Sequence, residues 1–360
     1  MKGPVLYCMI MLYLVSYYNS LKTAVVTGIT GQDGAYLADH LLKDGYNVIG
    51  VSRPVSNPST ENLDRLGVTD LVSIETLDLT DKGSIERVVS THKPEKFFNL
   101  AAQSFVSASF NCPAVTSEIN SMGVVRILET LRNFSPETKF YQASTSEMFG
   151  KVQAVPQNES TPFYPRSPYG ISKLFSHWMT INYRESYQMY AVSGILFNHE
   201  SPLRGKQFVT RKIITHLVRR KLKKISSPLM LGNLSARRDW GHAKDYVAGM
   251  NLMLDQANPE DFVLATGKTY SIREFVEKVC EYLGFQLVWT GEDLHEKGID
   301  TQSGELLVCI DELFYRPSEV DLLQGDPTKA EKLLGWKRKF DINGLIADMI
   351  HHEIEYLGKK

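Results

Sequence analysis

The sequence has no excess of charge of either sign, because 40 Lys and Arg face 41 Asp and Glu among 360 residues. Nucleic acids and anionic membranes are bound through clustered positive charge, so this balance supports neither partner. Cysteine is also scarce, and Cys8, Cys112, Cys280 and Cys309 show no paired spacing. This pattern predicts reduced thiols in a cytosolic protein, with neither a disulfide framework nor a metal site.

Long apolar runs are missing except at the N-terminus. The stretch from Val5 to Tyr18 is nearly all apolar and follows Lys2, which is typical of a signal peptide or a short anchor. It is short for a transmembrane helix, which needs about 20 residues, and no Ala-x-Ala cleavage site follows it. We therefore expect a cytoplasmic protein with a dispensable apolar extension over residues 1–21, and a signal or an anchor is the alternative.

From Lys22 onward, short apolar runs alternate with amphipathic stretches. This alternation predicts βαβ units and a parallel sheet, and right-handed crossovers then give a doubly wound α/β fold of the Rossmann type. The expected strands are 23–27, 47–51, 71–79, 96–102, 139–145 and 191–197. The expected helices are 36–43, 168–187, 209–224, 244–254 and 272–282.

The composition of the chain changes after Phe197: the predicted loops become longer, and Pro and Gly become frequent over Ser201–Gly205. We therefore predict a Rossmann domain over residues 22–200 and a smaller, mainly substrate-binding C-terminal lobe over residues 201–360. Segments at about 238–268 are expected to return to the Rossmann domain. A run of five cations in the lobe is interpreted as a solvated face: Arg219, Arg220, Lys221, Lys223 and Lys224.

Three glycines follow the first predicted strand directly. Gly28, Gly31 and Gly34 have the spacing Gly-x-x-Gly-x-x-Gly and lead into a helix. Glycines let the backbone turn tightly and approach a pyrophosphate, which sits at the positive end of the helix. The triplet alone is a weak signal, but its place between strand and helix indicates a dinucleotide site rather than a structural turn.

The end of the second strand bears on the choice of cofactor. A carboxylate about 20 residues past the loop would bind the ribose hydroxyls of NAD, but this chain has Ser52-Arg53 there. Arg53 can pair with a 2′-phosphate, which favours NADP, and a solvated arginine is the alternative. Asp78-Leu79 ends the third strand, where a carboxylate could meet the adenine or simply form a turn.

A Tyr-x-x-x-Lys pair, Tyr169 with Lys173, opens the helix after the fifth predicted strand. At that spacing both side chains share one helix face, and the lysine cation would favour tyrosinate. The same spacing occurs at Tyr18 with Lys22 and at Tyr356 with Lys360. The first of these precedes the fold and the second lies at the chain end, so only Tyr169 is placed for catalysis.

The fifth strand ends in Thr145-Ser146-Glu147. Ligands of open α/β sheets bind outside the carboxyl ends of the strands, so this cluster and Tyr169 can converge. A hydroxyl beside the tyrosine would polarise a sugar carbinol. Glu147 adds a potential base that simple alcohol oxidation does not need, and a surface carboxylate is the alternative.

Together these residues resemble the extended short-chain dehydrogenase/reductase family and, within it, the GDP-mannose 4,6-dehydratase family. The resemblance extends from Lys22 to about Trp336. The phosphate loop and the Tyr-Lys pair mark only the superfamily, whereas the runs LFNHESP, FVTRKI and RDWGHAKDYV are far more specific. The matching runs are TGITGQDG, NLAAQSFV, YQASTSE, LFNHESP, FVTRKI, LGNL, RDWGHAKDYV and YRPSEVD.

The resemblance implies a lyase that converts GDP-mannose into the 4-keto-6-deoxy sugar and water, the first step towards GDP-fucose and other GDP-deoxyhexoses. Tyr169, helped by Lys173 and Thr145, would take the O4 proton while the C4 hydride moves to NADP. Glu147 would then remove the C5 proton, and Ser146 or Glu147 would protonate the leaving hydroxyl at C6, before the hydride returns there. These five residues are the predicted catalytic set.

The resemblance also assigns binding residues. The predicted cofactor contacts, besides Tyr169 and Lys173, are Gly28, Thr30, Gly31, Gln32, Asp33, Gly34, Arg53, Asp78, Leu79, Leu100, Ala101, Ala102, Gln103, Ser104, His199 and Arg204. The predicted substrate contacts are Asn198, Val209, Lys212, Arg238, Arg316 and Glu319, among which cations suit a pyrophosphate and Glu319 suits ribose hydroxyls.

Two kinds of alternative stay open. A GDP-4-keto-6-deoxymannose reductase or another nucleotide-sugar epimerase or dehydratase would share most motifs, but reductases and epimerases need no Glu147. An inactive, cofactor-binding regulatory protein would not need the intact catalytic set. The family implies a homodimer or homotetramer. The tetramer is in doubt, because Pro54 stands where a second arginine is common and the loop over residues 54–66 looks short.

Overall fold

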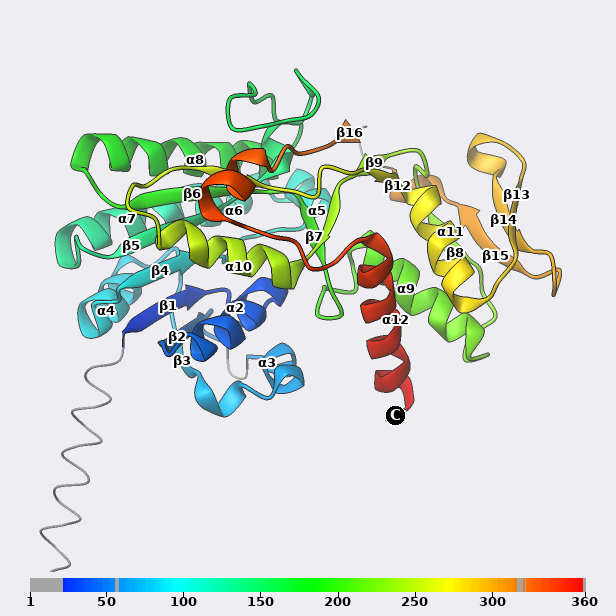
Figure 1. The fold of residues 1–360 in the computed structure, drawn as a ribbon, viewed down its shortest axis with the longest axis horizontal. Helices are drawn as coiled ribbons and strands as arrows, with labels where there is room; N and C mark the ends of the chain where they lie inside the picture. The colour runs from blue at the N-terminus through cyan, green and yellow to red at the C-terminus, as the bar shows by residue number, and fades with distance from the viewer. Residues whose placement is uncertain (1–21, 56–57, 316–319, 321, 359–360) are drawn as a thin grey trace, which may run out of the picture.

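The computed structural model describes residues 22–55, 58–315, 320 and 322–358. Its centre is a sheet of seven parallel strands in the order β11-β6-β5-β4-β1-β2-β3 (Figure 1). Strands β3 to β6 follow the order 3-2-1-4-5-6 of dinucleotide-binding folds, with β11 added beyond β6. The predicted Rossmann-type fold is therefore confirmed. The strands are β1 Thr23–Thr27, β2 Asn47–Ser52, β3 Ser73–Thr76, β4 Lys96–Asn99, β5 Lys139–Thr145, β6 Ala191–Leu196 and β11 Phe262–Leu264.

Helices cover both faces of this sheet because its strands are apolar on both sides. Val25 of β1 packs into one buried cluster with α4, α7 and α8, whereas its neighbours Ala24 and Val26 pack into another with α2 and α10. Successive strand residues point to opposite faces, so one short apolar strand supplies two cores. The helices are α2 Gln32–Lys43, α4 Lys82–His92, α7 Gly123–Phe134, α8 Pro168–Tyr187 and α10 Ala243–Leu254.

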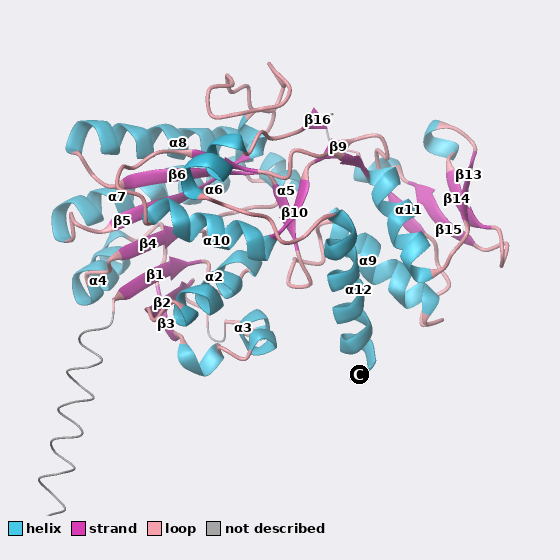
Figure 2. Ribbon diagram, viewed as in Figure 1, coloured by secondary structure: helices cyan, strands magenta, loops and turns pink. Residues whose placement is uncertain are grey.

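A second group of elements has a core of its own, beside the large sheet in Figure 2. Helices α9 Val209–Lys221, α11 Ile272–Leu283 and α12 Ile342–Gly358 pack with a four-stranded sheet in the order β13-β14-β15-β8. Its strands are β13 Leu287–Thr290, β14 Lys297–Asp300, β15 Leu306–Ile310 and β8 Leu229–Leu231. The predicted division near residue 200 stays a proposal, which this separate core supports.

Two small sheets join the large sheet to the second core. The first pairs β7 Asn198–Glu200 with β10 Trp240–His242, and the second has the order β12-β9-β16. These last strands are β12 Tyr270–Ser271, β9 Arg237–Arg238 and β16 Leu322–Leu323. The shorter helical elements are α3 Glu61–Leu66, η1 Thr69–Leu71, α5 Val106–Asn111, α6 Pro113–Ser117, η2 Glu118–Met122, η3 Ser146–Met148, η4 Asp293–His295, η5 Glu312–Phe314 and η6 Ala330–Leu334.

Several expected boundaries were wrong. Strand β4 ends at Asn99 rather than at residue 102, because the hydroxyl of Thr27 accepts the next two backbone N–H groups, of Leu100 and Ala101. Strand β3 covers only Ser73–Thr76, since a 3₁₀ turn occupies the residues before it. Helix α2 begins at Gln32 and not at residue 36, so that Gly34 lies within its first turn.

The interpretation of the basic run as a solvated face was wrong for one member. Arg220 is buried, and its guanidinium bonds the carbonyl of Ser226 and pairs with Glu305. The apolar N-terminal extension predicted over residues 1–21 lies outside the described residues. Within the part of the chain that the structure covers, no helix is long and apolar enough to cross a membrane.

Candidate active site

The phosphate loop joins β1 to α2 in a conformation that needs its glycines. Gly28 has φ of +70°, and a Cβ there would lie 3.1 Å from the backbone nitrogen of Ala101. A Cβ on Gly34 would lie 2.3 Å from the carbonyl oxygen of Gly28. Any side chain at Gly34 would therefore force the loop away from the helix. The three-glycine spacing predicted from the sequence thus makes a tight cradle at the N-terminus of α2, where anions are favoured.

A ladder of polar side chains aligns the strand ends beside this loop. The hydroxyl of Thr27 donates to Asn99 Oδ1 at 2.9 Å, and Asn99 Nδ2 donates to Gln142 Oε1 at 2.8 Å. The three residues belong to the adjacent strands β1, β4 and β5, and all are buried. Because each polar atom is satisfied by its neighbour, the carboxyl ends of these strands are held in register at the site.

Asn120 is a positioning residue that the sequence did not reveal. It lies in the π-helical turn η2, and its side-chain amide accepts from the N–H of Gln103 and donates to the carbonyl of Gln103 and to the hydroxyl of Ser172. Asn120 thereby ties the loop after β4 to the helix that carries Tyr169. Such π turns often mark functional sites, but no residue pattern here signals one.

Helix α8 begins so that Tyr169 lies in its first turn. Ser167 is the N-cap and accepts from the N–H of Gly170 at 3.0 Å, and Pro168 occupies the first position, where no N–H is needed. A Cβ on Gly170 would lie 2.8 Å from the carbonyl oxygen of Glu147. Glycine therefore lets the tyrosine helix approach the turn that carries Glu147.

Burial dominates the electrostatics of Tyr169. The pKa of Tyr169 is raised to about 12, mainly by burial and in part by the nearby charge of Glu147, while a hydrogen bond with Thr145 opposes the shift. Burial is the largest contribution because the side chain is enclosed. The Lys173 ammonium donates to the carbonyl of Ala143 at 2.8 Å. The stabilisation of tyrosinate by Lys173 stays a prediction.

Lys173 itself is shifted in the opposite sense. Its ammonium is buried and its pKa falls to about 8 because desolvation penalises the charged form. The ammonium is therefore present at neutral pH and is lost as the pH rises through about 8.

His199 and Asp33 form an ion pair across the cradle. Their Nε2 and Oδ2 atoms are 2.8 Å apart, and the other imidazole nitrogen contacts the carbonyl of Phe197. Burial opposes both charges, but the pair outweighs it, so the pKa of Asp33 is lowered and that of His199 is raised. The side-chain amide of Gln32 donates to the carboxylate of Asp33 and to the carbonyl of His199, and its oxygen accepts from the hydroxyl of Ser201. These bonds connect the phosphate loop to strand β7.

Two more of the predicted binding residues, Arg204 and Asn198, lie beside the glycine cradle and the Asp33–His199 pair. Arg204 pairs with Glu200 at 3.1 Å and lies over the ring of Phe208. The side-chain oxygen of Asn198 is buried and has no hydrogen-bond partner among the described residues. An unsatisfied buried acceptor is costly, so Asn198 is suited to receive a donor from a bound ligand.

These residues line one cavity of about 400 Å³ at the carboxyl ends of β1, β4, β5 and β6. It brings together the predicted catalytic set and much of the predicted cofactor set. The lining residues that had been predicted are Gly28, Thr30, Gly31, Gln32, Asp33, Gly34, Leu100, Ala102, Ser104, Thr145, Ser146, Glu147, Tyr169, Lys173, Asn198, His199 and Arg204. Asn62 and Gln207 also line it and were not predicted.

The other predicted residues do not line this cavity. Arg53 is exposed and follows the end of β2. Asp78 accepts hydrogen bonds from the N–H and the hydroxyl of Thr80, so it forms the turn that the sequence offered as the alternative to an adenine contact. Lys212 donates to the carbonyl of Met230 and lies over Phe314. Beyond the lining lie Leu79, Ala101, Gln103, Val209 and Arg238, whereas Arg316 and Glu319 lie outside the described residues.

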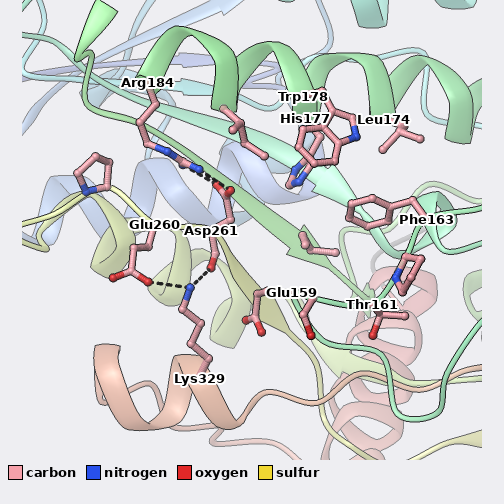
Figure 3. A pocket seen from close by; sticks show the side chains of 15 residues that line it. Glu159, Thr161, Phe163, Leu174, His177, Trp178, Arg184, Glu260, Asp261 and Lys329 are labelled. Carbon is pink, nitrogen blue, oxygen red and sulfur yellow. Dashed lines mark hydrogen bonds and ion pairs between the residues drawn. The ribbon is translucent and has the colours of Figure 1, made fainter. Parts of the chain in front are cut away.

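A larger cavity, of about 700 Å³, shares no lining residue with this one. Figure 3 shows the side chains that line the larger cavity. It is bordered by α8, by Phe163 and by the residues before β11, and four of its charged groups form ion pairs. Arg184 bonds Asp261, and Lys329 pairs with Glu260. Since it contains none of the predicted catalytic residues, the smaller cavity is the candidate active site. Among the described residues, no cluster of His, Cys, Asp or Glu is placed to hold a metal ion.

A Rossmann sheet with a glycine cradle and a Tyr-x-x-x-Lys pair at its carboxyl edge defines an enzyme of the extended short-chain dehydrogenase/reductase class. The fold agrees with solved structures: a UDP-glucose 4-epimerase from Thermus thermophilus in complex with NAD has a TM-score of 0.76 and 24% identity, covering 92% of this chain and 99% of that one. RMD from Pseudomonas aeruginosa complexed with NADPH has a TM-score of 0.72 and 19% identity, covering 93% and 99%.

Sequence comparison identifies the particular family. The family model for GDP-mannose 4,6-dehydratase matches residues 25–349. The GDP-mannose 4,6-dehydratase of Sinorhizobium fredii is 46% identical over 343 residues, covering 93% of this chain and 97% of the relative. The human enzyme is 46% identical over 344 residues, covering 93% and 92%. The chain belongs to the GDP-mannose 4,6-dehydratase family, and the resemblance predicted from the sequence is confirmed.

Proposed function

We propose that this chain removes water from GDP-mannose to give the GDP-4-keto-6-deoxy sugar, with NADP recycled within the site. The observation that carries the proposal is the convergence of Glu147 and Tyr169 on one cavity beside the glycine cradle. Reductases and epimerases of the class use the tyrosine alone for proton transfer at the alcohol. A carboxylate beside it supplies the second base that dehydration requires.

The cavity suits a nicotinamide dinucleotide. Gly28 and Gly34 leave the room that a pyrophosphate needs, because a Cβ at either position would meet backbone atoms. Thr30 to Gly34 would hold the phosphates, and Leu100, Ala102 and Ser104 would line the path towards Tyr169. A nicotinamide bound there would supply a hydride acceptor for C4 of the sugar and the hydride donor for C6, so that no net oxidation would occur.

The chain's own residues then have separate tasks. Tyr169 takes the proton of the C4 hydroxyl, with Thr145 bonded to it, and the ammonium of Lys173 stabilises the negative charge that develops. The ketone formed at C4 acidifies the C5 hydrogen, which Glu147 removes. Glu147 or Ser146 then protonates the C6 hydroxyl as it leaves. Asn198, with its unsatisfied oxygen, binds a hydroxyl of the sugar.

The test is incubation of the purified chain with GDP-mannose, followed by mass spectrometry of the nucleotide sugar. We expect a product lighter by one water. An isomer of unchanged mass would instead indicate an epimerase, and turnover confined to the 4-keto-6-deoxy sugar with NADPH would indicate a reductase. Bound cofactor without turnover of either substrate would indicate an inactive regulatory protein.

NADP, rather than NAD, is proposed because Arg53 follows β2 where a carboxylate would select NAD. Cofactor released from the purified chain should carry a 2′-phosphate. Arg53→Ala should weaken NADP binding by about ten- to a hundredfold, the value of a charge-assisted bond, and leave NAD binding nearly unchanged. The matched control is Lys22→Ala, since Lys22 is exposed and pairs with Glu95 at the other end of the sheet. Release of NAD alone would contradict the proposal.

A homodimer is proposed as the minimal assembly, with a homotetramer as the larger alternative. Helix α8 exposes Ile171, Phe175 and Trp178, which are spaced at i, i+4 and i+7 and so form one apolar stripe. Val115 and Met122 add exposed apolar surface from α6 and η2. Contiguous apolar surface of this kind is typical of a subunit interface.

A further inference from the structure

Asp239 is a buried carboxylate with no access to solvent, and its four hydrogen-bond donors are all uncharged. Oδ1 accepts from the N–H of Thr266 at 2.8 Å and from its hydroxyl at 2.6 Å. Oδ2 accepts from the N–H of Gly267 at 2.8 Å and of Gly325 at 3.3 Å. Burying a carboxylate costs free energy, so a site that keeps one is expected to need the bonds it makes.

The donors come from two segments that are distant in sequence from Asp239. Thr266 and Gly267 follow β11 at the edge of the large sheet, and Gly325 follows β16. The carboxylate therefore joins the Rossmann sheet, the β9–β10 segment and the chain after β16 at one point. Gln324 adds two bonds at the same junction. Its backbone N–H donates to the side-chain oxygen of Gln157, and its side-chain amide donates to the carbonyl of Gly267.

The immediate neighbours of Asp239 connect it to the ligand site. Arg238 lies in β9, where it pairs with Tyr270 of β12 and Leu323 of β16. On the other side, Trp240 of β10 pairs with Asn198 of β7. Asn198 lines the active-site cavity. Arg238 does not line that cavity; it is the buried arginine that the family resemblance assigns to the substrate. The Asp239 carboxylate thus fixes the backbone between β9, which carries Arg238, and β10, which pairs with the strand of Asn198.

We infer that Asp239 is a positioning residue for the nucleotide sugar: by holding the three-segment junction, it places Arg238 and Asn198 for substrate without touching the substrate itself. The inference rests on the proposed function. The four donors to Asp239 all lie outside the glycine cradle on β1 and α2, so we expect cofactor binding to depend on this junction less than substrate binding does.

Asp239→Asn is the test, because the amide would direct an N–H₂ group at backbone N–H donors that now meet an oxygen. We expect KM for GDP-mannose to rise about tenfold or more, with kcat changed by less than about threefold, in line with the loss of bonds to a charged group. Affinity for NADPH, measured by fluorescence titration, should stay unchanged. Binding of GDP alone, measured by calorimetry, should weaken with KM.

Asp245→Asn is the matched control. Asp245 lies on α10 and is a similarly buried carboxylate. It accepts hydrogen bonds from the backbone N–H groups of Lys339 and Phe340. It should lower thermal stability as much as Asp239→Asn does and leave KM unchanged. If Asp239→Asn does not fold, Thr266→Val removes one of the four donors to Asp239, together with the bonds of the same hydroxyl to the backbone of Lys268, and should give a smaller rise in KM with the same pattern.

The outcomes separate the two proposals. A wild-type chain that neither binds nor converts GDP-mannose overturns the proposed function, and this inference with it. Wild-type turnover combined with an unchanged KM in the Asp239 and Thr266 variants overturns the inference alone. An equal rise of KM in Asp245→Asn, or an equal loss of NADPH affinity, would show that the Asp239 carboxylate is merely structural.

Discussion

Glu147→Gln is expected to lower the rate of dehydration by about 10²–10⁴-fold, the usual cost of removing a general base. The amide keeps the size of the side chain and takes away its ability to accept the C5 proton. Tyr169 cannot replace it, because that residue is engaged with the C4 hydroxyl. The first oxidation should survive, since Tyr169, Lys173 and Thr145 remain in place around the cavity.

The two steps can be read separately. Reduced cofactor absorbs in the near ultraviolet, so Glu147→Gln should bind GDP-mannose, accumulate some enzyme-bound NADPH and release little 4-keto-6-deoxy product. Glu159→Gln is the control, because Glu159 is a partly buried carboxylate in the other cavity, where it accepts from the N–H of Val263 (Figure 3). Near-normal dehydration by Glu147→Gln would make this residue a bystander, and another base would have to be sought.

The fold was predictable because its signals are local. Apolar strands such as Thr23–Thr27 and Lys139–Thr145 begin and end in the structure at the residues where the sequence pattern bounds them. Helix α8 was also placed at its observed limits, since Ser167 and Pro168 make a strong N-terminal signal. Strand β4 was predicted too long because its end is set by Thr27, a residue distant in sequence that only the tertiary fold brings near.

The candidate site was predictable where chemistry depends on a spacing. The glycine cradle and the tyrosine helix are contiguous motifs, and both line the cavity. Residues that act through distant partners carry no such signal. Asn120 is one example, because a lone asparagine in a helical stretch does not show that it will bond the loop after β4. Asp239 is another: its four donors come from positions that no spacing in the sequence relates to it.

Charge was the property least accessible from sequence. The Tyr-x-x-x-Lys spacing predicted that the two side chains share a helix face, but it did not show that burial raises the pKa of Tyr169 to about 12 and lowers that of Lys173 to about 8. Both shifts disfavour the charged forms, which is what desolvation does to any pair of groups enclosed together. Spacing specifies which side chains share a face, whereas the solvent around them depends on the whole fold.

Tyr169→Phe is the second large expected effect. The substitution removes the hydroxyl that takes the C4 proton, so both oxidation and dehydration should fall by at least about 10²–10⁴-fold. Unlike Glu147→Gln, this variant should build no NADPH signal when GDP-mannose is added, because the reaction stops before the sugar is oxidised. Affinity for GDP-mannose should change little, since the ring that fills the cavity wall is retained. Stopped-flow absorbance, with mass spectrometry of the same samples, measures both quantities.

Tyr183→Phe is the matched control on the same helix. Tyr183 is also buried, but its hydroxyl donates to Glu129 at 2.6 Å and does not line the active-site cavity. Its loss should cost some stability and leave the rate unchanged. An NADPH signal in Tyr169→Phe as large as that of Glu147→Gln would show that the C4 proton leaves by another route. Since Lys173 and Thr145 are the remaining candidates in the cavity, Lys173→Met in the Tyr169→Phe background would then decide between them.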